Sequence, residues 1–192
     1  MVLPIMAYGS PVLRKMGETI NKDYPHLEEL ISNMRETMKN ARGVGLAAPQ
    51  IGKAIRLFIV DTSPFSEDEE LDEEERNILK NFNKIFINPK ILNEEGNDWA
   101  FNEGCLSIPN INEDVFRKET LTIEYLDENF KQHVETINGL VARVVQHEYD
   151  HIEGILFTDK LSSLKKRLLK KKLENISKGK IEVDYRMTFP KK

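Results

Sequence analysis

The stretch Gln146-His147-Glu148-Tyr149-Asp150-His151 places two histidines four residues apart, with a glutamate directly after the first. On an α-helix, positions four apart lie on one face, one turn above each other, so both imidazoles can bind one metal ion. The glutamate is then close enough to accept a proton from a water molecule that the ion makes acidic. The pattern is therefore typical of the metal-binding helix of a hydrolase.

The apolar residues around the motif support a helix at this position. They recur at spacings of roughly three to four residues, and Gly154 follows as a stop signal. The alternative without a function is a surface helix with two unrelated histidines. Histidine is scarce in this chain, with four in total, and two of the four lie in this motif, which argues against chance. The residues expected on the apolar face are Ile137, Leu140, Val141, Val144, Val145 and Ile152.

Two imidazoles leave a catalytic metal site short of a ligand, because such sites usually have three protein ligands. A third histidine could follow the second by six residues, but that position is Phe157, and no histidine follows His151. Downstream, Glu174 lies at a suitable distance within a lysine-rich segment. Upstream, Cys105 is the single cysteine, and a glycine precedes it. A thiolate with two imidazoles suits Zn²⁺, Fe²⁺, Co²⁺ or Ni²⁺, although a lone cysteine is ordinarily a core residue, so both candidates remain.

The composition indicates one soluble globular domain over residues 1–192. The chain is 40% hydrophobic and 31% charged, and its net charge of −4 argues against a nucleic-acid-binding chain as a whole. One cysteine excludes an internal disulfide and suits a reducing compartment. The N-terminus does not resemble a signal peptide, and no stretch approaches about 18 apolar residues, so we expect a cytoplasmic protein without a membrane segment.

Hydrophobic periodicity outlines the first half of the chain. We expect an amphipathic helix at residues 25–40, with Pro25 in its first turn, and a short strand at residues 56–61. Between them, residues 43–50 contain two glycines and end in a glutamine whose amide could donate to an oxyanion. The acidic run at residues 67–76 is expected on the surface, as a loop or as the first turn of a short helix.

The region between the acidic run and the motif is predicted to consist of strands. Residues 84–92 and 98–103 are expected to form two strands that flank a turn at residues 93–97. Residues 115–127 and 132–137 alternate in polarity and predict a β-hairpin.

A basic amphipathic helix is expected at about residues 160–177. Residues 160–180 hold nine Lys and Arg and one acid, a local net charge of +8, which leaves −12 for the rest of the chain. Such a helix either docks on the core with a solvated basic face or binds an acidic partner such as RNA. The residues expected to face the core are Leu161, Leu164, Leu168, Leu173 and Ile176.

Three separated segments together resemble the peptide deformylase family. They are Gly-x-Gly-Leu-Ala-Ala-Pro-Gln at 43–50, Glu-Gly-Cys-Leu-Ser at 103–107 and Gln-His-Glu-x-Asp-His at 146–151. Their order agrees, as do the chain length and the Gly-Ser-Pro-Val-Leu-Arg segment at 9–14. The resemblance implies a compact single-domain α+β fold, with antiparallel β-sheets around a central metal-binding helix and with an N-terminal and a C-terminal helix.

The resemblance also implies an activity and a metal. The implied enzyme is cytoplasmic and removes the formyl group from N-formylmethionyl nascent peptides, with release of formate. A metal-activated water would be the nucleophile, with Glu148 as the general acid and base. One Fe²⁺ per chain is the implied metal, which Zn²⁺ or Ni²⁺ can replace.

The resemblance assigns roles residue by residue. An ion pair of Glu103 with Arg117 would steady the cysteine segment. The assigned residues are Cys105, His147 and His151 for the metal; Glu148, Gln50 and the backbone N–H of Leu106 for catalysis; and Val44, Gly45, Phe101, Glu103, Gly104, Leu140, Arg143 and Val144 for the substrate.

Three features depart from the family pattern or from its expected chemistry. Asn112 stands where many members have an arginine, which puts one contact to the substrate backbone in doubt. Arg143 is more polar than a methionine pocket requires, although its stem could line a wall. The acidic run at residues 67–76 resembles an insertion relative to the shortest members.

Two other functions stay open at this stage. One is a metallopeptidase that uses Glu174 as its third ligand, and the other is a binding module with a purely structural metal. For the deformylase interpretation, we also expect the basic helix to contact the ribosome, because a nascent chain emerges beside ribosomal RNA phosphates. The residues expected in that contact are Lys165, Lys166, Arg167, Lys170, Lys171 and Lys172.

Overall fold

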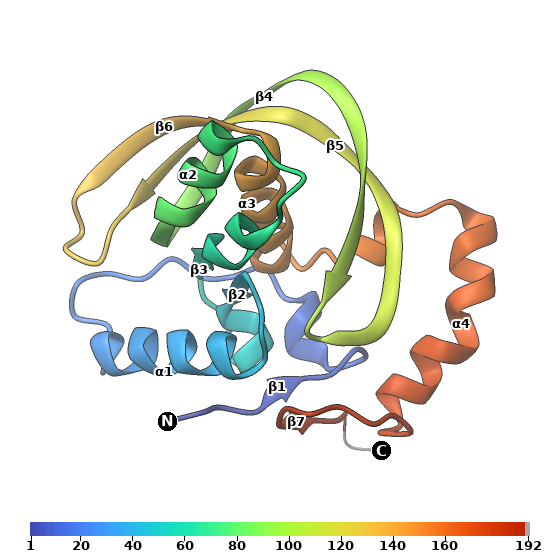
Figure 1. The fold of residues 1–192 in the computed structure, drawn as a ribbon. Helices are drawn as coiled ribbons and strands as arrows, with labels where there is room; N and C mark the ends of the chain where they lie inside the picture. Colours follow the sequence, from blue (N-terminus) through green and yellow to red (C-terminus); the bar gives the residue numbers. More distant parts are fainter. Residues whose placement is uncertain (191–192) are drawn as a thin grey trace.

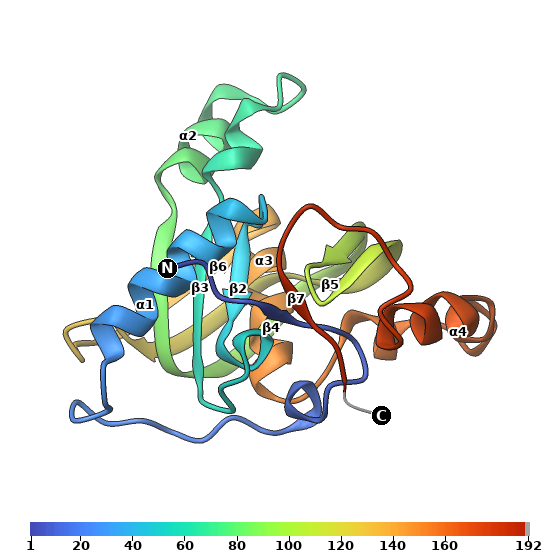
Figure 2. The ribbon, with the colours of Figure 1, turned by 90° about the horizontal axis from the view of Figure 1, so that it is seen from below.

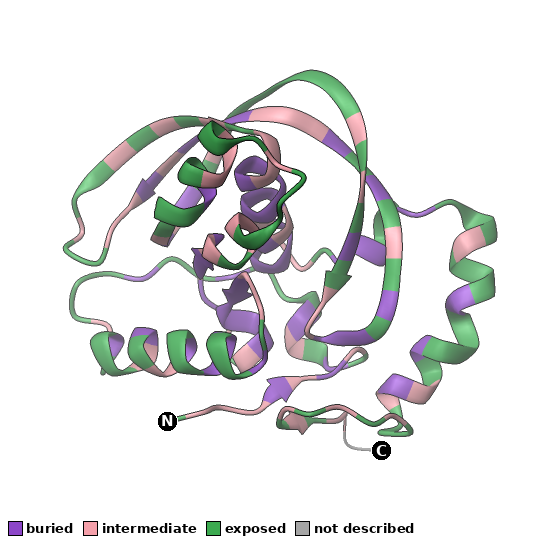
Figure 3. Cartoon of the chain, in the orientation of Figure 1, coloured by how far each residue is buried: buried purple, intermediate pink, exposed green. Residues whose placement is uncertain are grey.

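The motif helix α3 (Gly139–Ile152) lies at the centre of the molecule (Figure 1). In this computed structural model, which describes residues 1–190, most side chains of α3 are buried, whereas the other helices expose one face (Figure 3). The helix begins at Gly139, so Ile137 belongs to the preceding strand and not to the apolar face predicted for the helix. It ends at Ile152, and Gly154 follows with the positive φ of 73° that a stop residue allows. Because α3 is a core helix, its polar side chains need partners inside the protein.

A five-stranded antiparallel sheet curves around α3 (Figure 1). The strand order is β2-β3-β4-β5-β6, and every neighbouring pair is antiparallel. In β3, residues 57–60 are all apolar and buried, as a strand covered on both faces requires. The strands are β2 (Gly45–Ala47), β3 (Leu57–Asp61), β4 (Asn83–Cys105), β5 (Ile108–Leu126) and β6 (Gln132–Asn138).

The two long strands β4 and β5 form an arch over α3 (Figure 1). The turn predicted at residues 93–97 is wrong, because this segment continues β4, and its residues 93–95 pair with residues 120–122 of β5. Shifts in register on both sides of the segment accommodate its turn-forming residues as bulges, which bend a strand without ending it. The predicted hairpin of β5 and β6 is confirmed, with Leu126 opposite Gln132. The arch carries the end of β4 back to the motif helix.

Three further helices flank this core. Helix α1 (Leu27–Asn40) begins two residues after Pro25, so the proline does not lie in its first turn as predicted. His26 has a left-handed backbone conformation and redirects the chain before the helix begins. Helix α2 (Glu73–Asn81) begins within the acidic run, whose Glu73, Glu74 and Glu75 form its first turn, as one of the two predictions for this run had it. The side chain of Asp72 accepts a hydrogen bond from the Glu75 N–H at its N-terminus. Short 3₁₀ helices, which connect the other elements, are η1 (Pro11–Arg14), η2 (Ala48–Ile51), η3 (Ser63–Glu67) and η4 (Phe157–Lys160).

The basic helix α4 (Ser163–Ser177) packs on the core through Leu173 and Ile176, as predicted, and through Leu169, which was not predicted. Leu161, just before the helix, is also buried as predicted. Leu169, Leu173 and Ile176 are buried, whereas Leu164 and Leu168 are 57% and 70% exposed. An apolar face of α4 can include either positions 164 and 168 or position 169, which lies on the adjacent face. The sequence pattern alone does not decide which of these two faces packs on the core. The apolar cluster that contains Leu156 and Phe157 receives Leu169, and this contact sets the rotation of α4. Within residues 1–190, no helix is both long enough and apolar enough to cross a membrane.

A short parallel pair joins the two ends of the described chain (Figure 2). Strand β1 (Ile5–Met6) pairs with β7 (Met187–Thr188), with Ile5 opposite Met187. The sequence did not predict this pair, because two-residue strands have too little periodicity to recognise. The pairing brings the segment that follows α4 back across the molecule, beside the turn between β4 and β5, whose Ser107 C=O accepts a hydrogen bond from the Tyr8 N–H at 2.8 Å.

Candidate metal centre and active site

Three side chains from two distant segments meet beside α3. Cys105, His147 and His151 each offer one ligand atom, and these atoms all lie within 4.8 Å of one another. The Sγ of Cys105 is 3.3 Å from the Nε2 of His151. Such separations suit one ion with bond lengths of about 2.0 to 2.3 Å. One sulfur and two ring nitrogens are also a donor set that divalent iron, cobalt, nickel and zinc accept, so the residues fit the predicted metal.

The fold brings these ligands together through a strand end and a helix. Cys105 ends β4 and pairs with Ile108, so only two residues form the turn between β4 and β5. His147 and His151 stand one turn apart on α3, with ring centroids 5.1 Å apart. The Nδ1 of His147 lies 2.9 Å from Oε2 of Glu103, which leaves Nε2 directed at the metal position.

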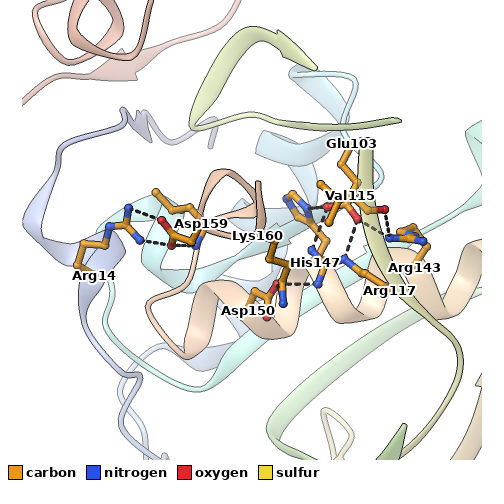
Figure 4. Close-up of polar contacts among 10 residues, drawn as sticks. Arg14, Glu103, Val115, Arg117, Arg143, His147, Asp150, Asp159 and Lys160 are labelled. Atoms are coloured by element: carbon orange, nitrogen blue, oxygen red, sulfur yellow. Dashed lines mark hydrogen bonds and ion pairs between the residues drawn. The ribbon is translucent and has the colours of Figure 1, made fainter. Parts of the chain in front are cut away.

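A buried ionic network holds the cysteine segment against α3 (Figure 4). Glu103 is 4% exposed and accepts hydrogen bonds from Arg117 at 2.7 and 2.9 Å. Arg117 also donates to Asp150 of α3 at 2.6 Å, so it links the strand to the helix. Burial disfavours the charge of Glu103, but the bonds from Arg117 and His147 hold the pKa of this carboxyl well below its ordinary value. The carboxylate therefore stays ionised and orients His147.

Arg143 also belongs to this network. Its contacts explain how a charged side chain can lie beside the cavity. Its side chain is 2% exposed, and it donates to Glu103 at 3.0 Å and to the C=O groups of Val115 and Trp99 at 3.0 and 2.7 Å. The guanidinium also lies 4.4 Å from the centroid of the Trp99 ring. The charge is thus paired within the protein, and Arg143 contributes a structural link in addition to lining the cavity.

Glu148 is buried beside the three ligands without a hydrogen-bond partner for one of its oxygens. Its residue exposure is 4%, and within residues 1–190 nothing donates to Oε2. Burial raises the pKa of Glu148 to about 7. Gly45 of β2 faces this carboxylate so closely that any side chain at position 45 would collide with it. A carboxyl with such a pKa can both accept and return a proton near neutral pH.

Two hydrogen-bond donors lie on the other side of the ligand cluster. The Oε1 of Gln50 accepts from the Ala47 N–H at 2.9 Å, so the amide NH₂ must face the cysteine turn. There it lies 3.3 Å from Oγ of Ser107 and 3.6 Å from Sγ of Cys105. The backbone N–H of Leu106 has no protein acceptor within residues 1–190. The Leu106 N–H can donate to a negatively charged oxygen, whereas the Gln50 amide would exchange one of its two long hydrogen bonds, to Ser107 or Cys105, for such a contact.

A cavity of about 800 Å³ opens beside these groups. Leu140 does not line it, contrary to our expectation, but packs in the core and borders a smaller hollow next to α2. Because it precedes Val144 by four residues, it lies about 6 Å further along the α3 axis, beyond the end of the cavity. The expected substrate residues that line the cavity are Val44, Gly45, Phe101, Glu103, Gly104, Arg143 and Val144.

The cavity has walls that sequence reasoning missed. Phe65 of η3 contributes from the segment just before the acidic run, and residues 182–185 contribute from the segment after α4. Asn112 also lines the cavity. No motif or periodicity marks Phe65 or residues 182–185, because only long-range packing brings them to the site.

The alternative ligands considered from the sequence lie elsewhere. Glu174 is on α4, its side chain is 50% exposed, and it lies 3.8 Å from the Lys178 ammonium. Phe157 is buried and stacks against His147, with ring centroids 6.1 Å apart. Within residues 1–190, Cys105 is thus the candidate that joins the two histidines.

A possible metal position, a buried carboxyl and hydrogen-bond donors facing one cavity are the requirements of metal-assisted hydrolysis. The site and the mixed helical and antiparallel fold are therefore those expected of a metallohydrolase with a single metal ion.

Comparison with known proteins narrows this class. The chain matches the family model described as polypeptide deformylase over residues 2–167. It is 66% identical over 190 residues to the peptide deformylase of Christiangramia forsetii, covering 99% of this chain and 97% of that protein. Identity to the peptide deformylase of Flavobacterium johnsoniae is 62%, with 98% and 96% covered. This chain therefore belongs to the polypeptide deformylase family.

Solved structures agree with this assignment. The peptide deformylase of Thermus thermophilus superposes with a TM-score of 0.79 at 38% identity, covering 93% of this chain and 99% of that one. That of Legionella pneumophila gives a TM-score of 0.77 at 35% identity, covering 94% and 98%. The expected α+β fold is thus confirmed. The protein is a metal-dependent enzyme that removes the formyl group from N-formylmethionine at the start of newly made proteins.

Proposed function

We propose that Glu148 moves the proton during deformylation, while Gln50 and the Leu106 N–H bind the oxyanion. The observation that carries this assignment is the buried Glu148 carboxyl, whose Oε2 has no partner within residues 1–190. Its position beside Cys105, His147 and His151 supports a direct role, because any water that reaches the metal position also meets Glu148. A divalent ion held by those three side chains supplies a Lewis acid that polarises the formyl oxygen and makes water more acidic.

The chain's own groups then account for the remaining steps. Glu148 takes one proton from water, and the water oxygen adds to the formyl carbon. The formyl oxygen becomes negative at this point, and the donors on Gln50 and Leu106 stabilise it. Glu148 returns the proton to the methionine nitrogen as the carbon–nitrogen bond breaks, which gives the free amine and formic acid, and the acid releases its remaining proton to water to become formate.

The substitution Glu148→Gln tests the assignment most directly. The amide keeps the size of the side chain but cannot accept a proton, so we expect formate release from a formyl-methionyl peptide to fall by about 10²- to 10⁴-fold. Metal content and melting temperature should stay near the parent values. Near-full turnover by this variant would show that the proton takes another route.

The residues around the cavity also support a specificity. Val44, Phe101 and Val144 offer an apolar wall for an unbranched side chain such as methionine, and Gly43, Gln50 and Leu106 line the same cavity as the proposed metal ligands. We expect formyl peptides to react far faster than the matching acetyl peptides, which carry one more methyl group. Comparable cleavage of internal peptide bonds would favour a metallopeptidase instead.

We propose Fe²⁺ as the resident ion, which Zn²⁺ or Ni²⁺ can replace. The thiolate and two imidazoles of Cys105, His147 and His151 support any of these ions, so the test must distinguish them. Protein purified without oxygen should contain about one iron per chain, and removal of any one of the three side chains should abolish most of the binding. In air, the iron form should lose activity faster than the nickel form, because oxygen attacks iron beside a thiolate. Equal lifetimes would argue against iron.

We also propose that residues 1–192 form one catalytic domain that acts in the cytoplasm. In this proposal, α4 is a docking helix that contacts the ribosome. The exposed basic face of α4 supports this role, but Lys165 is already paired with Glu113 at 2.6 Å. Glutamine should therefore replace only Lys166, Arg167, Lys170, Lys171 and Lys172, with Lys165→Gln as the matched control. We expect the fivefold variant to lose co-sedimentation with ribosomes at low salt, while it keeps its peptide turnover. Co-sedimentation equal to the parent would end this proposal.

A further inference from the structure

The segment after α4 forms one wall of the active-site cavity. Residues 181–188, which we call the C-terminal strap, return across the molecule and end in β7 beside β1 (Figure 2). Residues 182–185 of the strap line the same cavity as the metal ligands. The family model ends at residue 167, so the strap lies outside the segments that define the family. Its role has to be derived from its own contacts.

The strap is fixed at both ends of its path along the cavity. Asp184 forms an ion pair with Arg42, which also lines the cavity. Further along, the N–H groups of Ile5 and Ala7 donate to the strap backbone at 2.8 and 2.9 Å. Between these anchors the side chain of Tyr185 packs, partly buried, against the hydrophobic cluster of α1, β2 and β3. The backbone hydrogen bonds and the packing restrict where Tyr185 can lie, while the Arg42–Asp184 pair is largely exposed and adds little.

Tyr185 reaches the turn that follows the cysteine ligand. Its hydroxyl donates a hydrogen bond of 2.8 Å to the C=O of Leu106. Burial raises the pKa of Tyr185, so the hydroxyl keeps its proton and remains a donor at neutral pH. Within residues 1–190, no other side chain donates to this carbonyl.

Leu106 has few other constraints on its backbone. It is one of the two residues between β4 and β5, and its own N–H has no protein acceptor within residues 1–190. Its side chain packs over Gly43, where a Cβ would lie 2.8 Å from Cδ1 of Leu106. In so short a turn, fixing one peptide plane restricts the next, so the bond from Tyr185 limits the direction of the Leu106 N–H.

We propose that Tyr185 is a positioning residue, whose hydroxyl holds Leu106 so that the Leu106 N–H points at the oxyanion. This inference rests on the proposed role of that N–H. A donor stabilises a developing charge most when it is already oriented, so a mobile Leu106 would slow the reaction with little effect on substrate binding.

The substitution Tyr185→Phe tests this role in the full chain, because it removes only the hydroxyl. Tyr24→Phe is the matched control, since Tyr24 packs against the same hydrophobic cluster but has no bond to the cysteine turn. We expect kcat for a formyl-methionyl peptide to fall about 10-fold in Tyr185→Phe, with KM within about twofold of the parent. In the zinc-loaded protein, amide hydrogen exchange at Leu106 should become at least about 10-fold faster, while exchange in α3 stays unchanged.

The possible outcomes separate this inference from the oxyanion assignment. Suppose that Gln50→Ala loses activity, as the oxyanion assignment requires. In that case, a Tyr185→Phe variant with the kcat of the parent protein, or with unchanged amide hydrogen exchange at Leu106, would overturn the positioning role alone. Faster exchange throughout the protein, or failure to fold, would show that the hydroxyl serves general stability, which also overturns the inference. Full activity in Gln50→Ala would overturn the oxyanion assignment, and the positioning role with it.

Discussion

At the scale of single residues, Gly45 shows how the absence of a side chain shapes the site. The residue lies on β2, where it is opposite Val60 of β3, and it faces the carboxylate of Glu148. The backbone cannot retreat easily, because β2 is hydrogen-bonded to β3 and its three residues are buried. A methyl group at position 45 must therefore displace Glu148.

We expect Gly45→Ala to lower kcat/KM for a formyl-methionyl peptide by about 10²-fold, since small misplacements of a catalytic group are costly. Metal analysis and a melting curve should accompany the rate measurement, because they show whether the substitution also disturbs the metal site or the fold. Retention of activity within about twofold, with the metal bound, would mean that the carboxylate tolerates the displacement.

At the scale of elements, α4 shows how packing selects one face of a helix. Leu168 and Leu169 are neighbours in the sequence, but the first is 70% exposed and the second is 7% exposed. Leu169 contacts the cluster that holds Leu156 and Phe157, directly after the motif helix.

This pair of leucines gives a matched prediction about stability. Leu169→Ala should lower the free energy of unfolding by about 2 to 5 kcal/mol, because it leaves a cavity in the core. Leu168→Ala should change it by less than about 0.5 kcal/mol. Urea unfolding of both variants measures the difference, and equal losses would contradict the observed rotation of α4.

At the scale of the whole molecule, the segment after residue 161 serves the core and the active site together. It supplies the buried residues Leu169, Leu173 and Ile176, and it ends in the C-terminal strap that lines the cavity. The match to the family model over residues 2–167 therefore does not delimit a self-sufficient enzyme.

A chain that ends after residue 161 should consequently lose both stability and peptide turnover. A chain that ends after residue 179 keeps α4 and should retain most of its stability, but its kcat should fall at least as far as in Tyr185→Phe. Melting curves and formate release distinguish the two truncations. Full turnover in the longer one would show that the strap is dispensable.

The sequence alone determined the chemistry and the central helix of this protein. The spacing of His147, Glu148 and His151 is a local property, because the geometry of one helix turn fixes where these side chains point. The two other motifs were also recognisable, since each is contiguous, and together they indicated the family and the fold.

Only the tertiary structure decided which separate segments meet. Cys105, and not Glu174, lies beside the two histidines, because the bulges in β4 bend the arch back to α3. No local sequence pattern predicts such a bend. The same reason explains why residues 93–97 were mistaken for a turn. Phe65 and Tyr185 reach the cavity through contacts between residues far apart in the sequence, and a linear pattern carries no signal for contacts of that kind.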